Sequence, residues 1–511
     1  MGERKLSAKG FILFSILILL TFSFGWDIQK ADCKSRVVVA QGGEPTRLDP
    51  DMHRDAISNN GCRQVYDALL ERDQNGKIVP NLAESWRYVN ETVLEFKLRK
   101  GINFSNGEPF NAEVVKYNFE RVSGMLPEAK KTLNAIDFSL IQEIKIIDAY
   151  TVQIILKKPS LLMPSFVSQK LIVPLKYTKE DNFERLSTKP IGTGPYVLKS
   201  WTKGSELVFE AKKDYWKGAP KIDEVVFRPI PEDRTRIAEL IVGNVDIIAN
   251  LKPDNIEEVK AQKNLDVKFV PSTRTAFVII NTEIEKMKDV RIRKAINYAL
   301  DVPSLMKNVM GGNAYRVSTL CPKNFVGWDS EEKFYPYDPE MAKKLLAEAG
   351  FPNGMDLTIL TPRGRFLNDV QTCEAIAGML TKVGIRTKVN AVEVGLFFRQ
   401  TAAHQLQEEL LYAAWGNYHF DILNTLQAIA KSGQMFSWYS NKKVDDYIDD
   451  AAKTGDPAKY AEYLRLALRE IWNDAGFGFL YNLRDVYGVN KRVVWEPRPD
   501  EIINLYGAYV K

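Results

Sequence analysis

The stretch that decides the fold is residues 83–115, AESWRYVNETVLEFKLRKGINFSNGEPFNAEVV. Leu94, Phe96 and Leu98 alternate with charged residues, which predicts a β-strand with one face turned toward a hydrophobic core. Glycine, asparagine and proline then form a turn region, and Asn111 is a suitable N-cap for the helix-like pattern that follows it. A strand, a glycine-bearing turn and a capped helix are therefore expected in quick succession.

Length and composition indicate an ordinary globular protein with more than one lobe. A chain of 511 residues exceeds a single hydrophobic core, and its 26% charged and 45% hydrophobic residues are typical of soluble domains. The formal net charge of +5 is spread along the chain without a basic block, which argues against a nucleic-acid surface. The three histidines show no metal-binding spacing such as HExxH, so we expect neither histidine-based catalysis nor a zinc site.

Residues 1–25 carry the features of an export signal. A basic N-terminus precedes an apolar run over residues 11–24 that hydroxyl residues interrupt. A membrane-spanning helix needs about 20 apolar residues, whereas the core of an export signal needs about 7 to 15. We therefore expect a signal peptide that is cleaved after residue 25 or as late as residue 31. An uncleaved membrane anchor is the alternative.

Four cysteines raise the questions of lipidation and of disulfide bonds. Charged residues stand close before Cys33, which does not fit a lipid-attachment motif. In an exported chain the four cysteines can pair in three ways. If the lobes move apart, each bridge belongs within one lobe, which predicts Cys33 with Cys62 and Cys321 with Cys373. Free buried thiols are the alternative.

Residues 83–115 resemble the signature of the extracellular solute-binding proteins of family 5, the peptide and nickel-chelate receptors of ATP-driven importers. The shared features are Ala-Glu-Ser-Trp at the start, Phe-Lys-Leu-Arg on the strand, and then Phe104, Gly107, Phe110, Asn111 and Ala112. Other segments show the same resemblance, including Asn-Val-Asp-Ile at residues 244–247 and TAFVIINT at residues 275–282. The resemblance covers essentially everything after residue 35.

This resemblance implies an α/β, two-lobed periplasmic-binding-protein fold, type II and cluster C-like, with mixed sheets and a hinge between the lobes. The expected units are lobe I at residues 33–277 and 484–511, an extra subdomain within it at about residues 70–190, and lobe II at residues 278–483. In the family, the strand at residues 275–282 carries the chain into lobe II, and a later strand returns it. Two crossings make a hinge, at which we expect Asn281 and Asn482.

Lobe II shows part of its pattern directly in the sequence. Asp338 is a suitable cap for a helix that ends at Gly350, and a strand, a helix and a second strand follow at residues 356–361, 370–382 and 385–392. This order predicts an α/β lobe with a partly parallel sheet.

The loop after the first of these strands, PRGRFLND, carries Arg363 and Arg365. Sheets of this kind bind ligands at the carboxyl ends of their strands, and the planar fork of an arginine suits a carboxylate. In the resembled dipeptide receptors, an arginine in this region holds the C-terminal carboxylate of the ligand. The spacing leaves both Arg363 and Arg365 eligible, and a solvated surface arginine is the alternative for each.

The second informative loop is LYAAWGNYHFD, at residues 411–421. In the resembled peptide receptors, a tryptophan-containing strand precedes an acidic loop that takes the α-ammonium group of the peptide. Trp415 is present here as an apolar wall, but Asn417, Tyr418 and His419 stand where acids are usual, and the first acid is Asp421. This difference makes a standard dipeptide a weaker expectation and favours a conjugate or another small organic ligand.

Each polar residue of this loop has an expected role. Asn417 or Asp421 is expected to receive the polar or cationic end of the ligand. His419 is a candidate ligand for a nickel chelate, with a packing role as the alternative. Trp438, in an aromatic stretch that also resembles the family, completes the set of candidate ligand-binding residues.

We therefore expect the substrate-binding component of an ABC importer, which captures a small peptide or peptide-like organic ligand between closing lobes. It is expected to deliver this ligand to a permease and ATPase complex in the inner membrane. We expect a monomer at the periplasmic or extracellular face of the membrane, with no cofactor, metal or nucleic acid.

Two kinds of alternative stay open. A nickel-chelate, opine or sugar-conjugate receptor uses the same fold, and a sensory protein would present its ligand to a receptor instead of a permease. A hydrolase is not expected, because the sequence shows no nucleophile motif and no pair of carboxylates that can be placed across one cleft.

Overall fold

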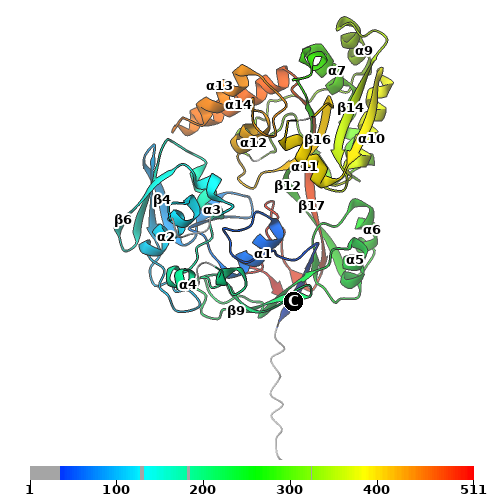
Figure 1. The fold of residues 1–511 in the computed structure, drawn as a ribbon. Helices are drawn as coiled ribbons and strands as arrows, with labels where there is room; N and C mark the ends of the chain where they lie inside the picture. Colours follow the sequence, from blue (N-terminus) through cyan, green and yellow to red (C-terminus); the bar gives the residue numbers. More distant parts are fainter. Residues whose placement is uncertain (1–34, 127–131, 181–183, 324, 405) are drawn as a thin grey trace, which may run out of the picture.

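The computed structural model describes residues 35–126, 132–180, 184–323, 325–404 and 406–511. The expected export signal and Cys33 lie outside these residues. The described chain forms two lobes that are joined by long β-strands, with the yellow and orange segments of lobe II above the blue and cyan segments of lobe I (Figure 1). The expected two-lobed α/β fold with mixed sheets is confirmed.

A mixed sheet runs through both lobes. Within the described residues it has eleven strands, ten of them in the order β15-β14-β16-β12-β17-β11-β1-β10-β9-β8, and β13 pairs with β17. The lobe I strands are β1 (Arg36–Gln41), β8 (Tyr196–Thr202), β9 (Glu206–Ala211), β10 (Glu224–Pro229) and β11 (Ile247–Ile248). The lobe II strands are β13 (Ala314–Arg316), β14 (Met355–Pro362), β15 (Ile385–Val392) and β16 (Leu410–Gly416).

Two strands, β12 (Leu265–Ile280) and β17 (Phe477–Asn490), belong to both lobes. They pair antiparallel, and their register is interrupted between Pro271 and Thr275. The expected strand at residues 275–282 is the lobe II part of β12, and its polar first half is also a strand because it pairs with β17. These two strands form the crossing between the lobes (Figure 1).

Along each crossing strand, the buried residues pass from the hydrophobic core of one lobe to that of the other. On β12, Val270 packs in a lobe I core and Ala276 in a lobe II core. On β17, Leu483 packs in lobe II and Val486 in lobe I. Both changes lie close to the expected lobe boundaries after residues 277 and 483.

The stretch at residues 83–115 builds the extra subdomain of lobe I. Its sheet has the order β4-β5-β7-β6 and consists of β4 (Ala83–Asn90), β5 (Val93–Leu98), β7 (Thr151–Leu156) and β6 (Ile141–Asp148). Leu94 and Phe96 are fully buried, as the alternation on β5 predicts. The helix α2 (Ala112–Ser123) begins after Asn111, whose side chain accepts a hydrogen bond from the amide of Val114 at 3.1 Å, so the predicted cap is confirmed.

The remaining elements of lobe I are short. Its other helices are α1 (Ala56–Val65), α3 (Met163–Gln169), α4 (Leu175–Glu180), α5 (Asp233–Ile241) and α6 (Ile256–Lys260). Two small antiparallel pairs complete it: β2 (Leu70–Arg72) with β3 (Ile78–Pro80), and β18 (Val493–Val494) with β19 (Tyr509–Val510).

Lobe II carries most of the longer helices. They are α7 (Val290–Ala299), α8 (Val302–Asn308), α9 (Pro339–Glu348), α10 (Asp369–Lys382), α11 (Val394–Ala402), α12 (Ile422–Ile429), α13 (Lys442–Ala451) and α14 (Pro457–Asn473). The Asp338 cap of α9 is confirmed by a 2.9 Å hydrogen bond from the amide of Met341. β14 and β15 pair in parallel on either side of α10 in the sequence, so the predicted strand-helix-strand unit is also confirmed.

One prediction about the cysteines is wrong. Cys321 and Cys373 are free, buried thiols that pack in two different hydrophobic clusters of lobe II, so they do not form a disulfide. Cys62 is also a free buried thiol, and its sulfur lies 3.3 Å from Nε2 of His53. Cys33, its expected partner, lies outside the described residues.

Among the described residues, no helix is both long enough and apolar enough to span a membrane.

Candidate functional site

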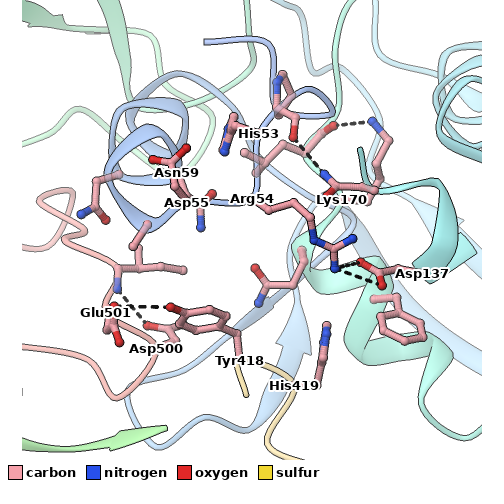
Figure 2. A pocket seen from close by; sticks show the side chains of 18 of the residues that line it. His53, Arg54, Asp55, Asn59, Asp137, Lys170, Tyr418, His419, Asp500 and Glu501 are labelled. Atoms are coloured by element: carbon pink, nitrogen blue, oxygen red, sulfur yellow. Dashed lines mark hydrogen bonds and ion pairs between the residues drawn. The ribbon is translucent and has the colours of Figure 1, made fainter. Parts of the chain in front are cut away.

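Two adjoining cavities lie between the lobes, and both are lined by Arg54 and Tyr418. The first, which we call the polar cavity, has a volume of about 130 Å³ and is lined mainly by lobe I residues such as His53, Asp55 and Glu501 (Figure 2). The second, which we call the aromatic cavity, has a volume of about 270 Å³ and is lined mainly by lobe II residues. The shared residues make them two parts of one chamber.

The aromatic cavity takes its name from a wall of large rings. Trp415, at the end of β16, lies 5.8 Å from the ring of Phe436, centre to centre. Trp438 is 1% exposed, stacks on His404 at 4.4 Å, and its indole Nε1 is buried without a hydrogen-bond partner. Such a surface suits the apolar part of a small organic ligand.

Two arginines line the same cavity, one from the loop after a lobe II strand and one from a crossing strand. Arg365 follows β14, and Arg274 lies on β12 beside the register interruption. Arg274 has one carboxylate partner, Glu501, at 3.4 Å. Arg365 is exposed and, among the described residues, has no carboxylate partner; its guanidinium lies 5.4 Å from the ring centre of Phe366.

The electrostatic surroundings of Arg365 favour an anion. Partial burial lowers the pKa of Arg365, and the positive charge of Arg274 lowers it further. A guanidinium beside a second one is stabilised more by a carboxylate than by a neutral group. The carboxylate supplies the opposite charge and can accept two parallel hydrogen bonds.

Arg363, the other expected arginine, lies on the outside of the same loop. Its side chain is exposed and contacts the carbonyl oxygen of Ala391 at 3.5 Å. It does not line either cavity.

The polar side chains at residues 417 and 421 form hydrogen bonds within lobe II that fix the conformation of the loop. The amide nitrogen of Asn417 donates to the carbonyl oxygen of Asp421 at 2.7 Å and to the hydroxyl of Thr425 at 2.8 Å, and its oxygen accepts from the amide of His419 at 3.0 Å. Asp421 caps α12 by accepting from the amide of Leu423 at 2.9 Å.

Asp421 has its second oxygen occupied as well. The hydroxyl of Tyr460 donates to it at 2.8 Å. Burial raises the pKa of Asp421 to about 6. The side chains of Asn417 and Asp421 are therefore held inside lobe II and line neither cavity.

His419 lies at the contact between the lobes. Its Nδ1 lies 3.2 Å from the hydroxyl of Ser165, its ring lies edge-on to Phe166 at 4.7 Å, and its carbonyl oxygen accepts from Arg72 at 2.6 Å. Burial lowers the pKa of His419 to about 3, so the ring is neutral at physiological pH. His419 lines the polar cavity, and Figure 2 shows it on the same side of the view as the Arg54–Asp137 ion pair.

Of the two asparagines expected at the hinge, one lies at the crossing between the lobes and the other lies within lobe II. Asn482 is at the crossing, where its side-chain amide donates to the carbonyl oxygen of Arg274 at 2.9 Å. Asn281 follows the end of β12 and contacts Glu408 and Glu409 within lobe II.

Several lining residues were not found by sequence reasoning. Arg54, Arg274, Tyr418 and Glu501 all contribute to the chamber. For Arg274 a signal existed, since it is a lone charge directly before an apolar strand; Glu501 had none, because it approaches the site from the end of the chain. The described residues contain no group of three or more His, Cys, Asp or Glu side chains placed to hold a metal ion.

A chamber between two lobes that are joined by two crossing strands defines a class: binding proteins that enclose a small molecule by lobe closure. The model of the bacterial extracellular solute-binding proteins, family 5 (middle), matches residues 77–437, which is more than half of the chain. The chain belongs to this family.

Individual relatives agree with this assignment. The glutathione-binding protein GsiB of Escherichia coli (strain K12) is 29% identical over 456 residues, which cover 86% of this chain and 87% of that protein. The structure of HbpA2 from Haemophilus parasuis has a TM-score of 0.83 at 24% identity and covers 93% of this chain and 100% of that one. The periplasmic binding protein DppA from Helicobacter pylori, in complex with the peptide STSA, has a TM-score of 0.76 at 24% identity and covers 93% and 98%.

Family membership sets the general function. The protein is the solute-binding component of an ABC importer, it works outside the cytoplasm, and its relatives are binding proteins of transporters and not enzymes.

Proposed function

We propose that the protein captures a peptide-like organic ligand with a free carboxylate and delivers it to the permease of its importer. In this proposal, the carboxylate is held by Arg365 with help from Arg274, and the apolar part of the ligand lies against Trp415 and Trp438. The observation that carries the proposal is the exposed guanidinium of Arg365, which faces the aromatic cavity without a carboxylate partner among the described residues.

The size of the chamber supports a small ligand. The two cavities of about 130 and 270 Å³ adjoin, and together they reach the lower end of the range for small-molecule sites, roughly 300–1,000 Å³. Relatives named as glutathione-binding and peptide-binding proteins support a ligand of a few amino-acid residues. Import as a monomer, through a permease and ATPase complex of the inner membrane, is part of the same proposal.

Asn417, His419 and Asp421 have no direct role in ligand binding in this proposal. Their hydrogen bonds shape the end of β16 and the start of α12, and thereby position Trp415 and Tyr418.

The test compares peptides with and without a terminal carboxylate. Isothermal titration calorimetry would measure the binding of glutathione and of a panel of dipeptides, each beside its C-terminal amide, to the wild type and to Arg365→Ala. We expect the wild type to prefer the free acid, and Arg365→Ala to weaken binding of the acid by about 1.5–3 kcal/mol, the range for hydrogen bonds to charged groups.

Arg363→Ala is the matched control, because it removes an arginine from the same loop that does not line the chamber. Equal losses in both variants would show that the loop, and not the guanidinium of Arg365, matters. Equal binding of acids and amides by the wild type would remove the carboxylate from the proposal.

A further inference from the structure

A peptide-like ligand carries an ammonium group as well as a carboxylate, and the chamber must supply an acceptor for it. The loop at residues 417–421 does not, because its one carboxylate, Asp421, is enclosed by Leu423 and Tyr460. Within the described residues, four other carboxylates line the chamber: Asp55, Asp137, Asp500 and Glu501.

Two of these four have short contacts within lobe I, Asp55 through one oxygen and Asp500 through both. Asp55 caps α1 by accepting from the amide of Ser58 at 2.7 Å. Asp500 is 4% exposed and forms a two-point ion pair with Arg498, at 3.0 and 2.6 Å.

The other two differ in how tightly they are held. Asp137 forms a two-point ion pair with Arg54, at 2.9 and 3.3 Å. Glu501 has two longer contacts, one to Nη2 of Arg274 and one to the hydroxyl of Tyr418, each at 3.4 Å (Figure 2 shows the second). Among these four carboxylates, Glu501 is the one whose side-chain contacts are all as long as 3.4 Å, so its contacts are the weakest to exchange for a ligand.

The backbone at Glu501 has a strained conformation. Its φ angle is +59°, in the left-handed region that residues other than glycine rarely adopt. Strain of this kind is retained at sites where a side chain must point in a particular direction. Glu501 belongs to the last segment of lobe I, whereas Tyr418 belongs to lobe II and Arg274 lies on the crossing strand β12, so the carboxylate reaches across the gap between the lobes.

A second, buried carboxyl group lies in the corner behind Glu501. Asp485, on β17 at the crossing, has a buried carboxylate oxygen without a hydrogen-bond partner. Burial raises the pKa of Asp485 well above its ordinary value, and the charge of Glu501 raises it further, with a smaller contribution from Asp500. Arg274 lowers it, but does not offset these effects. A cationic group placed at Glu501 would offset the negative charge that acts on Asp485.

We infer that Glu501 accepts the ammonium group of the ligand, and that binding exchanges the Arg274–Glu501 ion pair for two ligand contacts. The ligand carboxylate takes Arg274 together with Arg365, and the ligand ammonium takes Glu501. The ion pair has one positive and one negative charge, as a zwitterionic ligand does, and its separation of 3.4 Å is long for a hydrogen-bonded pair. This inference rests on the proposed function and adds the amine to its ligand class.

The test uses the same peptide panel with its amines blocked. Calorimetry would compare glutathione and the dipeptides with their N-acetylated forms, on the wild type and on Glu501→Gln. Glutamine keeps the size and an acceptor oxygen but removes the charge. We expect the wild type to bind the free amine about 30-fold or more tightly than the acetylated form, and Glu501→Gln to lose this preference while it still prefers acids over amides.

Glu496→Gln is the matched control, since Glu496 belongs to the same C-terminal segment, is exposed, and lines neither cavity. Circular dichroism melting curves check that both variants are folded. A Glu501→Gln variant that keeps the preference for free amines overturns the inference and leaves the proposed function intact. A wild type that binds none of the peptides overturns both.

Discussion

The carboxylate of Asp369 accepts a hydrogen bond from the backbone amide of Arg365 at 2.8 Å, so the loop that presents the guanidinium is fixed from inside the protein. The same carboxylate accepts from the amides of Gly364 at 3.1 Å and Phe366 at 3.0 Å, and Asp369 is 3% exposed. One buried side chain therefore holds three consecutive amides of the binding loop. Precise placement of this kind reduces the entropy that a ligand must remove.

Asp369→Asn is expected to weaken both the fold and ligand binding. Asparagine keeps one acceptor oxygen but replaces the other by a donor, which leaves amides of the loop without their charged acceptor. We expect the free energy of unfolding in urea to fall by about 1–3 kcal/mol. Affinity for the free-acid peptide should fall as well, although Arg365 is unchanged. Asp356→Asn is the control, since Asp356 forms an exposed ion pair with Arg386 that contributes little to stability. Unchanged peptide affinity in Asp369→Asn would show that the loop needs no internal support.

The stability of the closed form is expected to depend on pH through His419. Its pKa is lowered to about 3 by burial, whereas the unfolded chain takes up a proton below about 6.5. The neutral ring therefore contributes its full stability above pH 6.5, and this contribution is lost as the pH falls toward 3. Urea denaturation of the wild type and of His419→Gln would measure it.

The expected result is a difference between the two proteins that shrinks by up to about 1.4 kcal/mol for each pH unit between pH 6.5 and 4.5. Asp421, whose pKa of about 6 acts in the opposite direction, is present in both proteins and cancels in the difference. A difference that stays constant over this range would mean that His419 is protonated within the folded protein.

Local patterns predicted the elements, and tertiary contacts decided the site. The cap at Asn111 and the arginine loop after β14 could be read from the sequence because each depends on neighbours within a few positions. The Arg274–Glu501 contact joins residues 227 positions apart, and no local signal indicates it. Asn417 and Asp421 looked like ligand-binding residues because they are polar and lie beside Trp415. Their roles depend on partners such as Thr425 and Tyr460, which the fold alone brings into contact.

The free thiols give a simple chemical prediction. Burial raises the pKa values of Cys62 and Cys321 well above the ordinary range and that of Cys373 to about 12, so none is a thiolate at neutral pH. We expect a thiol reagent such as Ellman's to leave these three residues unmodified in the folded protein and to modify them in urea. Peptide mapping by mass spectrometry identifies the sites. A disulfide between Cys321 and Cys373 in the purified protein would contradict the structure.

Gly76 of lobe I lies against the ring of Phe420 of lobe II. A Cβ atom at Gly76 would lie 2.6 Å from the Phe420 ring, which is too close for any real contact. Gly76→Ala should therefore disfavour the closed form. We expect it to weaken peptide binding by about 1–3 kcal/mol, the usual cost of overpacking. Small-angle X-ray scattering with saturating peptide should then give a larger radius of gyration than for the wild type.

Gly107→Ala separates closure from backbone strain. Gly107 has a φ of +85° against +81° for Gly76, so alanine costs a similar amount of strain at both positions, but a Cβ at Gly107 would meet nothing within 4 Å. Gly107→Ala should lower the melting temperature by a similar amount and leave peptide affinity unchanged. If both variants bind peptide as the wild type does, the contact between Gly76 and Phe420 is not part of the ligand-bound state. If both lose affinity equally, the loss comes from strain in lobe I and not from closure.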